Sequence, residues 1–184
     1  MEIDDQTVEY IGENDGFFIR YLPIKNDPNF AFCHLFLNGQ IIGDQNEACY
    51  LVTWLSSMRN VKERITDNSK LLYHREFFNR NDQELFELIL KSNELKKDFN
   101  IEYDYLPVLE NEVWNNCHIS IDETTDAYLI MMLEIDDKIK FLWKGWRQPC
   151  AIDKISSLYS VVIDKKVIIE TIEKVLSKLQ PGNN

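Results

Sequence analysis

Two Cys-His dipeptides, Cys33-His34 and Cys117-His118, are the residues whose types most directly suggest chemistry. Thiolate and imidazole groups are the usual ligands of zinc, which binds four of them in a tetrahedron. Each dipeptide falls in a segment with the composition of a strand, and neighbouring side chains on a strand point to opposite faces. Neither dipeptide can therefore present both of its ligands to one ion. Since the four cysteines also contain no Cys-x-x-Cys spacing, the sequence predicts no metal site.

A nucleophilic pair of Cys or Ser with His can be assembled from these residues, but no motif supports one. The chain has no Gly-x-Ser-x-Gly motif and no loop of closely spaced glycines that could cradle a phosphate. We therefore predict neither catalytic residues nor a cofactor. A small enzyme with a site built around Cys117, His118 and the acidic loop that follows stays an alternative, because catalytic groups need to meet only in space.

The acidic loop contains Asp122, Glu123 and Asp126. These carboxylates lack the regular ligand spacing of a calcium-binding loop, and a charge run of this kind is usually a solvated surface. Its functional interpretation is an electronegative surface that binds a basic partner protein. Other acidic residues near predicted strand ends could extend this surface: Glu102, Asp104, Glu110, Glu112, Asp136 and Asp137.

The stretch Trp143-Lys144-Gly145-Trp146-Arg147-Gln148-Pro149-Cys150 holds two of the four tryptophans of the chain. Trp and Arg are the residue types that most often anchor protein–protein interfaces. Large aromatic rings also fill cores, where the glycine could allow a bulge and the proline would end strand pairing. Both interpretations stay open: Trp143, Trp146 and Arg147 either plug the core or anchor a partner.

The strands that must position these residues are predicted by runs of aromatic and β-branched residues. They cover residues 16–22, 30–37, 40–42, 101–105, 114–121, 128–135, 138–143 and 158–163. Asn38-Gly39 is the strongest hairpin signal, since type I′ turns favour this dipeptide. Residues 128–133, Tyr-Leu-Ile-Met-Met-Leu, are apolar on both faces, which is typical of a central strand that is covered on both sides.

Helices are predicted over residues 45–58, from Asn81 to about residue 95, and from Asp164 to Leu179. The first two begin with capping-box spacing, and the last carries an apolar stripe at helical intervals. Strands gathered in the second half, with helices between and after them, give an α+β fold. We expect one domain over residues 1–184, with a mostly antiparallel sheet and two or three packed helices, including the C-terminal amphipathic helix.

The composition narrows the possible partners. With 31 acidic and 20 basic residues, the chain has a net charge of −11, which opposes binding to nucleic-acid phosphates or to an anionic membrane. The N-terminal residues lack the pattern of a signal peptide, and no apolar run approaches a membrane span of about 20 residues. We therefore expect a cytoplasmic protein with reduced thiols that binds neither nucleic acid nor a membrane.

Four segments together resemble a family of bacterial immunity proteins, the immunity 42 type. They are Asp104-Tyr105-Leu106-Pro107, Ile119-Ser120-Ile121-Asp122-Glu123-Thr124, the Trp143–Cys150 stretch, and Leu158-Tyr159-Ser160-Val161. A C-terminal amphipathic helix follows them, as in the family. The resemblance covers roughly the last 80 residues well and the first half loosely, and the Trp-Lys-Gly-Trp-Arg core is its most specific part.

Proteins of this family are antidotes encoded beside polymorphic toxins, including contact-dependent growth inhibition toxins. The resemblance implies a cytosolic, non-enzymatic protein that binds and neutralises one cognate toxin domain, and it carries no catalytic residues. The acidic composition agrees, because a toxin domain that cuts nucleic acid must be basic to hold phosphates. The alternatives are the small enzyme described above and an adaptor that binds a protein without inhibiting it.

Overall fold

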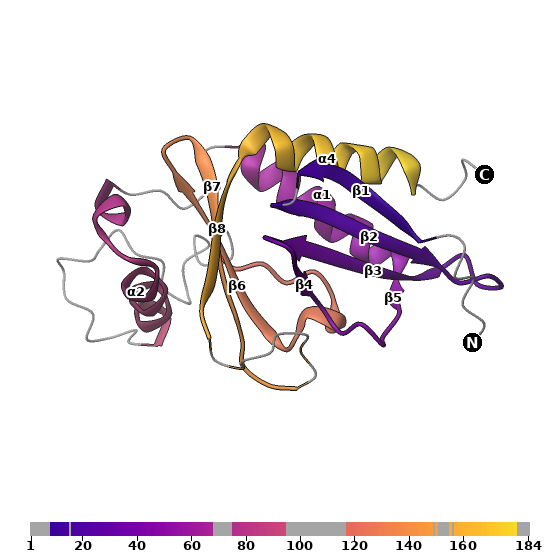
Figure 1. Ribbon diagram of the computed structural model, residues 1–184, viewed down its shortest axis with the longest axis horizontal. Coiled ribbons are helices and arrows are strands. Elements are labelled where there is room, and N and C mark those ends of the chain that lie inside the picture. The colour runs from indigo at the N-terminus through magenta and orange to yellow at the C-terminus, as the bar shows by residue number, and fades with distance from the viewer. Residues whose placement is uncertain are drawn as a thin grey trace.

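The structure is a computed structural model that describes residues 8–14, 16–67, 75–94, 117–148, 150, 155 and 157–179. Its first sheet, coloured indigo to purple in Figure 1, is antiparallel, with the order β1-β2-β3-β4 and with β5 also paired to β3. The strands are β1 (Glu9–Asn14), β2 (Phe17–Pro23), β3 (Phe30–Leu37), β4 (Gln40–Ile42) and β5 (Cys49–Tyr50). Asn38 and Gly39 both have positive φ, which confirms the predicted hairpin between β3 and β4.

The second sheet is also antiparallel, with the order β6-β7-β8. Its strands are β6 (Tyr128–Ile135), β7 (Lys138–Gly145) and β8 (Tyr159–Asp164). The helices in the described residues are α1 (Leu51–Thr66), α2 (Asp82–Glu94) and α4 (Lys165–Lys178), together with the short 3₁₀ helices η2 (Arg75–Asn79) and η4 (Glu123–Thr125). The predicted α+β class, the antiparallel pairing and the C-terminal helix are therefore confirmed.

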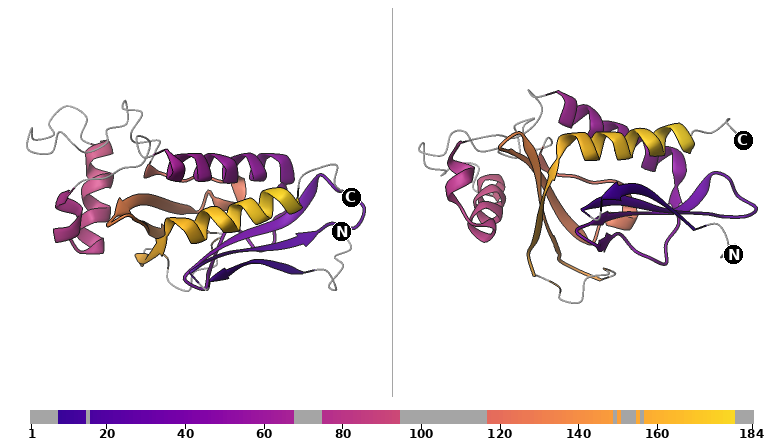
Figure 2. Two further views of the ribbon diagram at one scale, coloured as in Figure 1. Left: turned by 90° about the horizontal axis from the view of Figure 1, so that it is seen from above. Right: turned by 45° about the horizontal axis from the view of Figure 1, so that its top comes forward.

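The main core lies where the two sheets meet α1 and α4. In Figure 2 these two helices run side by side along the first sheet. Phe17 of β2 stacks on Phe141 of β7 with ring centroids 6.0 Å apart, so one aromatic pair joins the two sheets. On β6, Ile130 and Met132 face this core, as the period of two along a strand requires.

A second, smaller core lies on the other face of the second sheet, where α2 packs (Figure 1). Met131 and Leu133 of β6 contact this core together with the buried Leu85, Phe86 and Ile89 of α2. The prediction that the apolar strand over residues 128–135 is covered on both sides is therefore confirmed. In the strand order, β7 is central, and β6 is flanked on its other side by a single bridge between His118 and Met131.

Helix α2 begins with the capping box that its sequence predicts. The amide of Glu84 donates to Asn81 Oδ1 at 2.9 Å, and the amide of Asn81 donates to Glu84 Oε2 at 3.2 Å. The next residue, Asp82, then attaches the helix to the second sheet, because its carboxylate accepts hydrogen bonds from Lys140 of β7 and Ser160 of β8. Burial raises the pKa of the Asp82 carboxyl, but these two hydrogen bonds lower it more, so its pKa lies below the ordinary 3.8.

Replacing Asp82 with Asn is therefore expected to destabilise the protein in a pH-dependent way. A carboxyl whose pKa is lower in the folded chain stabilises the fold above its unfolded pKa, and that contribution is lost as the pH falls through the folded value. Melting curves of the wild type and Asp82→Asn should differ at pH 7 and converge below the ordinary aspartate value of 3.8. A difference that did not shrink as the pH falls below 3.8 would contradict this role of the carboxylate.

Helix α4 buries the predicted stripe, which consists of Ile168, Ile172, Val175 and Leu179. Replacing Ile172 with Ala should lower the free energy of unfolding by about 2–5 kcal/mol, since it leaves a cavity in the main core. Glu170→Ala on the exposed side of the same helix is the control and should change it by less than about 0.5 kcal/mol. Urea unfolding of both variants measures this, and an Ile172→Ala loss as small as that of the control would show that the helix is not docked.

The predicted helix over residues 45–58 is wrong at both ends, because α1 spans Leu51–Thr66. Asp44 does not cap a helix; its Oδ1 accepts a hydrogen bond from the amide of Asn46 at 2.9 Å in a local turn. The chain then forms β5, and the amide of Leu51 donates to Asn29 O at 2.8 Å, so the helix begins only after this pairing. The helix continues past residue 58 because Val61 and Ile65 extend its buried face.

Two of the predicted strands are not confirmed, and one observed strand was not predicted. The predicted strand over residues 101–105 lies outside the described residues, as does most of the one over 114–121. The described part of that second segment, residues 117–121, forms only the bridge to β6, so the prediction of a strand is wrong there. Strand β1 was not predicted, since Gly12 interrupts it; Gly12 has φ +128°, and a Cβ there would lie 2.8 Å from Phe18 Cβ.

Candidate functional site

The acidic loop forms a defined structure in which Asp122 caps the 3₁₀ helix η4. Its Oδ1 accepts hydrogen bonds from the amide of Thr124 at 3.2 Å and from the Thr124 hydroxyl at 2.6 Å. The amide of Asp122 donates to Thr125 Oγ1 at 3.5 Å, which completes a capping box. Burial raises the pKa of the Asp122 carboxyl, although Thr124 donates to it. Asp122 therefore shapes the loop, while Glu123 and Asp126 extend into solvent.

Helix α1 holds the segment that leads into this loop. The buried guanidinium of Arg64 donates from both terminal nitrogens to His118 O, at 3.0 and 3.1 Å. Two turns earlier on the same face of α1, the Ser57 hydroxyl donates to Ile121 O at 2.6 Å. Three hydrogen bonds from a well-packed helix thus fix residues 118–121 and, with them, the start of η4.

Two acidic residues from the first half of the chain lie beside η4. The amide of Asp44 donates to Thr124 O at 2.9 Å, and Glu47 lies close enough for its charge to raise the pKa of Asp122. We call these five residues the acidic patch: Asp44, Glu47, Asp122, Glu123 and Asp126. The sequence predicts the three members of the patch in and around η4. It also assigns Asp44 and Glu47 to the cap of a helix, and that assignment is wrong.

The wider electronegative surface expected from the sequence does not form in one place. Asp136 and Asp137 form the turn between β6 and β7, at the opposite end of β6 from Asp126, so they do not join the acidic patch. Their positive φ values are those of a tight hairpin turn. The other four acidic residues considered in the sequence, at positions 102, 104, 110 and 112, lie outside the described residues.

The two tryptophans of the Trp-Lys-Gly-Trp motif have different environments. Trp143 is 0% exposed; its ring stacks on Tyr159 of β8, with centroids 6.0 Å apart, and its Nε1 donates to Gln40 Oε1 at 3.2 Å. Trp146 is 49% exposed. The core interpretation therefore applies to Trp143, which no partner can reach in this structure, and the surface interpretation applies to Trp146.

Trp146 is fixed against the acidic loop. Its amide donates to Ala127 O at 3.0 Å, and its Nε1 donates to Asp126 O at 2.9 Å. The guanidinium carbon of Arg147 lies 4.6 Å from the centre of the Trp146 ring, and Arg147 Nη2 lies 3.9 Å from Asp126 Oδ2. Three of the candidate residues, Asp126, Trp146 and Arg147, are thus brought together on the surface.

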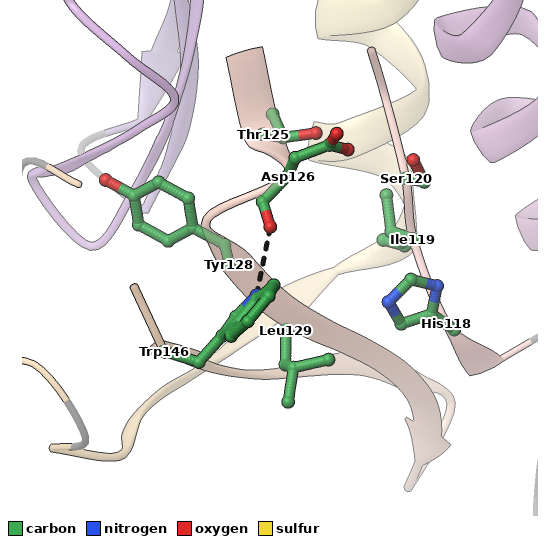
Figure 3. Close-up of a pocket in the computed structure, with 8 residues that line it drawn as sticks. All are labelled: His118, Ile119, Ser120, Thr125, Asp126, Tyr128, Leu129 and Trp146. Atoms are coloured by element: carbon green, nitrogen blue, oxygen red, sulfur yellow. Dashed lines mark hydrogen bonds between the residues drawn. The ribbon is translucent and has the colours of Figure 1, made fainter. Parts of the chain in front are cut away.

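A pocket of about 180 Å³ opens beside Trp146. Figure 3 shows Trp146 and His118 at opposite sides of it, with Leu129 between them. The lining residues are His118, Ile119, Ser120, Thr125, Asp126, Tyr128, Leu129 and Trp146. The pocket thus has aromatic and aliphatic walls and a carboxylate at its rim, and it joins the acidic patch through Asp126.

The two Cys-His dipeptides do not form a reactive centre. Cys117 is fully buried against α2, and burial raises the pKa of its thiol to about 12, so it carries almost no thiolate at neutral pH. His118 instead lines the pocket, and burial together with the Arg64 charge lowers its pKa. Cys33 faces the main core, while His34 Nε2 lies 3.1 Å from Asp44 O. Among the described residues, no three His, Cys, Asp or Glu side chains gather as metal ligands.

Several residues of this site were not singled out in the sequence, among them Ser120, Leu129 and Thr125. The family resemblance could have indicated this site, because two of the segments that carry it meet here. Residues 119–124 supply one wall and the loop, and Trp146 supplies the other wall. A third segment lies in the second sheet, where Tyr159 stacks on Trp143. The fourth, residues 104–107, lies outside the described residues.

Comparison with known proteins agrees with the family resemblance noted in the sequence. The sequence model of the family described as immunity protein 42 matches residues 8–178. Among solved structures, the chain is similar to the crystal structure of CdiI from Burkholderia dolosa AUO158, with a TM-score of 0.60 and 16% sequence identity over 92% of this chain and 99% of that one. No curated protein matches the sequence. None of the helices in the described part of the chain has the length and apolar character that a membrane span requires.

Proposed function

Because the chain belongs to the immunity protein 42 family, we propose that it binds one cognate bacterial toxin domain and thereby neutralises it. The observation that carries this proposal is the family match over residues 8–178, which spans the α-helices and both sheets of the described residues. The similarity in fold to CdiI from Burkholderia dolosa AUO158 supports a role in contact-dependent growth inhibition. The protein acts in the cytoplasm, as one domain over residues 1–184.

The toxin contacts the surface formed by the acidic patch, Trp146 and Arg147. This surface combines an exposed, firmly held aromatic ring with a guanidinium and several carboxylates, which is the composition of interface anchors. Asp122 keeps the loop in shape rather than contacting the toxin through its buried carboxylate oxygen.

The toxin domain is basic, and a nuclease is the type that fits best. Nucleases need Lys and Arg to hold phosphates, and an acidic inhibitor complements that surface. Neither nucleic acid nor a membrane is a partner, in keeping with the net charge of −11. The protein inhibits by binding and not by catalysis: a site around Cys117, His118 and the acidic loop would need a reactive thiol, and the Cys117 thiol is buried with a pKa of about 12.

Co-expression tests the proposed function. The C-terminal domain of the toxin encoded directly upstream should arrest growth when produced alone and should not do so when the full immunity chain is produced with it. The two proteins should also copurify. If the toxin domain stays lethal and does not bind the purified chain, the proposed function is wrong.

Charge reversal in the acidic patch is expected to slow association with the toxin. Glu47 and Glu123 are exposed, and their replacement by Lys removes long-range attraction without altering the hydrogen bonds of Asp122. The association rate should fall by about tenfold or more at low salt, and the wild-type rate should approach that of the variant as salt rises. Stopped-flow fluorescence measures both rates.

The control carries the same change in net charge elsewhere: Glu87→Lys on α2 with Glu170→Lys on α4, both at exposed positions. It should retain most of the wild-type rate. An association rate that does not respond to salt or to the Glu47 and Glu123 reversals would contradict electrostatic steering, even if the toxin binds.

A further inference from the structure

The pocket beside Trp146 has the size of a single side chain. Its volume of about 180 Å³ lies below the roughly 300–1,000 Å³ of small-molecule and cofactor sites. Its residues come from the segment before η4, from η4 itself, from β6 and from the loop after β7, so four parts of the chain build it. A protein side chain that projects from a partner is therefore a more suitable occupant than a metabolite.

We propose that this pocket receives one arginine side chain of the toxin, with the guanidinium against the Trp146 ring and the Asp126 carboxylate. The proposal rests on the toxin-binding function proposed above and specifies its chemistry. The proposal concerns the short-range contacts inside the pocket, whereas the acidic patch attracts the toxin over a longer range.

The lining residues favour a cationic occupant with an apolar stem. None of the eight is Lys or Arg, and Asp126 places a carboxylate at the rim. The indole of Trp attracts cations more strongly than any other aromatic side chain. Leu129 and Ile119 offer apolar surface to the methylene groups of a long basic side chain, as such stems usually require.

An arginine of the chain itself makes the same kind of contact on the surface next to the pocket. The guanidinium of Arg147 lies over the Trp146 ring at 4.6 Å and reaches Asp126 Oδ2 at 3.9 Å, yet Arg147 is not among the residues that line the pocket. Trp146 and Asp126 therefore already contact one guanidinium, that of Arg147, and a toxin arginine in the pocket shares both groups with it. Arginine fits better than lysine because its planar group can stack on the ring and donate several hydrogen bonds, to Asp126 and the exposed Ser120.

Double-mutant cycles with the toxin domain test the assignment. Each Arg and Lys on the toxin surface is replaced by Gln, and binding is measured against the wild type and Asp126→Asn. One arginine should couple to Asp126, so that the loss of affinity in the double variant is smaller, by about fivefold or more, than the product of the two single losses. A second cycle with Trp146→Phe should show that the same toxin arginine also couples to Trp146.

The matched control is Asp136→Asn, which removes the same charge from the turn at the far end of β6 and tolerates the positive φ there. It should bind the toxin within about twofold of the wild type, which is the additive behaviour of a distant site. If the wild type binds the toxin but no basic toxin residue couples to Asp126, the arginine assignment is wrong while the proposed function stands. If the wild type does not bind at all, the proposed function has failed.

A measurement without the toxin decides the assignment independently. The full chain is titrated with N-acetyl-arginine amide and with N-acetyl-citrulline amide, its neutral isostere, at constant ionic strength, and the indole N–H signal of Trp146 is followed by NMR. The arginine derivative should shift this signal at least about threefold more than citrulline at equal concentration, and Asp126→Asn should remove the difference, since the guanidinium charge supplies the cation–π and ionic contacts. Equal shifts with both probes would overturn the assignment.

Discussion

Replacing Trp143 with Ala is expected to lower the free energy of unfolding by about 3–5 kcal/mol. The ring is fully buried in the main core and stacks on Tyr159, and its Nε1 donates to Gln40 on the other sheet. The variant therefore loses a large apolar volume, an aromatic contact and a hydrogen bond that joins β7 to β4. Urea unfolding followed by circular dichroism measures the change.

Trp146→Ala is the matched control, since it removes the same side chain three residues away. It should cost about 1 kcal/mol, close to the value of the one side-chain hydrogen bond that is lost, because half of the ring already faces solvent. If the two variants were destabilised equally, the assignment of one tryptophan to the core and the other to the surface would be contradicted.

The same Trp146→Ala variant is expected to raise the rate of dissociation from the toxin by about 30-fold or more. An anchor in the centre of an interface typically contributes about 2 kcal/mol or more, and affinity changes of this kind appear mainly in the dissociation rate. The association rate should change little, because the variant keeps every carboxylate of the acidic patch. Surface plasmon resonance with immobilised toxin separates the two rates.

Tyr50→Ala supplies the control for this experiment. Tyr50 is a large aromatic residue with a similar exposed fraction, 44%, but it lies on β5, where its ring contacts Phe30. Its replacement should leave the dissociation rate within about twofold of the wild type, as at a position outside the contact surface. A dissociation rate unchanged by Trp146→Ala, in a toxin complex that still forms, would remove Trp146 from the interface.

The elements with strong local signals could be predicted from the sequence. Strand β3, with the Asn38-Gly39 turn after it, and strand β6 were predicted with their observed bounds, and so was the apolar stripe of α4. These elements depend on alternation, helical period and turn chemistry, which are properties of neighbouring residues.

The start of α1 could not be predicted, because it depends on a long-range contact. The spacing of Asp44 and Glu47 is that of a capping box, but Cys49 and Tyr50 pair with β3 and delay the helix. Local propensity was overridden by sheet pairing, which a single sequence does not reveal.

The candidate site was predictable in its residue types and not in its arrangement. The Trp-Lys-Gly-Trp-Arg motif was compatible with both a core plug and a partner anchor, and only burial distinguishes Trp143 from Trp146. In the same way, the sequence could not show that Glu47 lies beside η4 or that Asp136 lies at the far end of β6, since both depend on how the two sheets meet.

Hydrogen–deuterium exchange of the full chain, alone and with the cognate toxin domain, tests most directly where the toxin binds. The account predicts strong protection on binding in residues 119–129 and 144–148, which hold η4, the start of β6 and Trp146. It predicts little change in β1, which lies at the opposite edge of the first sheet from β4. Protection confined to α2 or to β1, with none around η4 and Trp146, would contradict the assignment of this surface as the toxin-binding site.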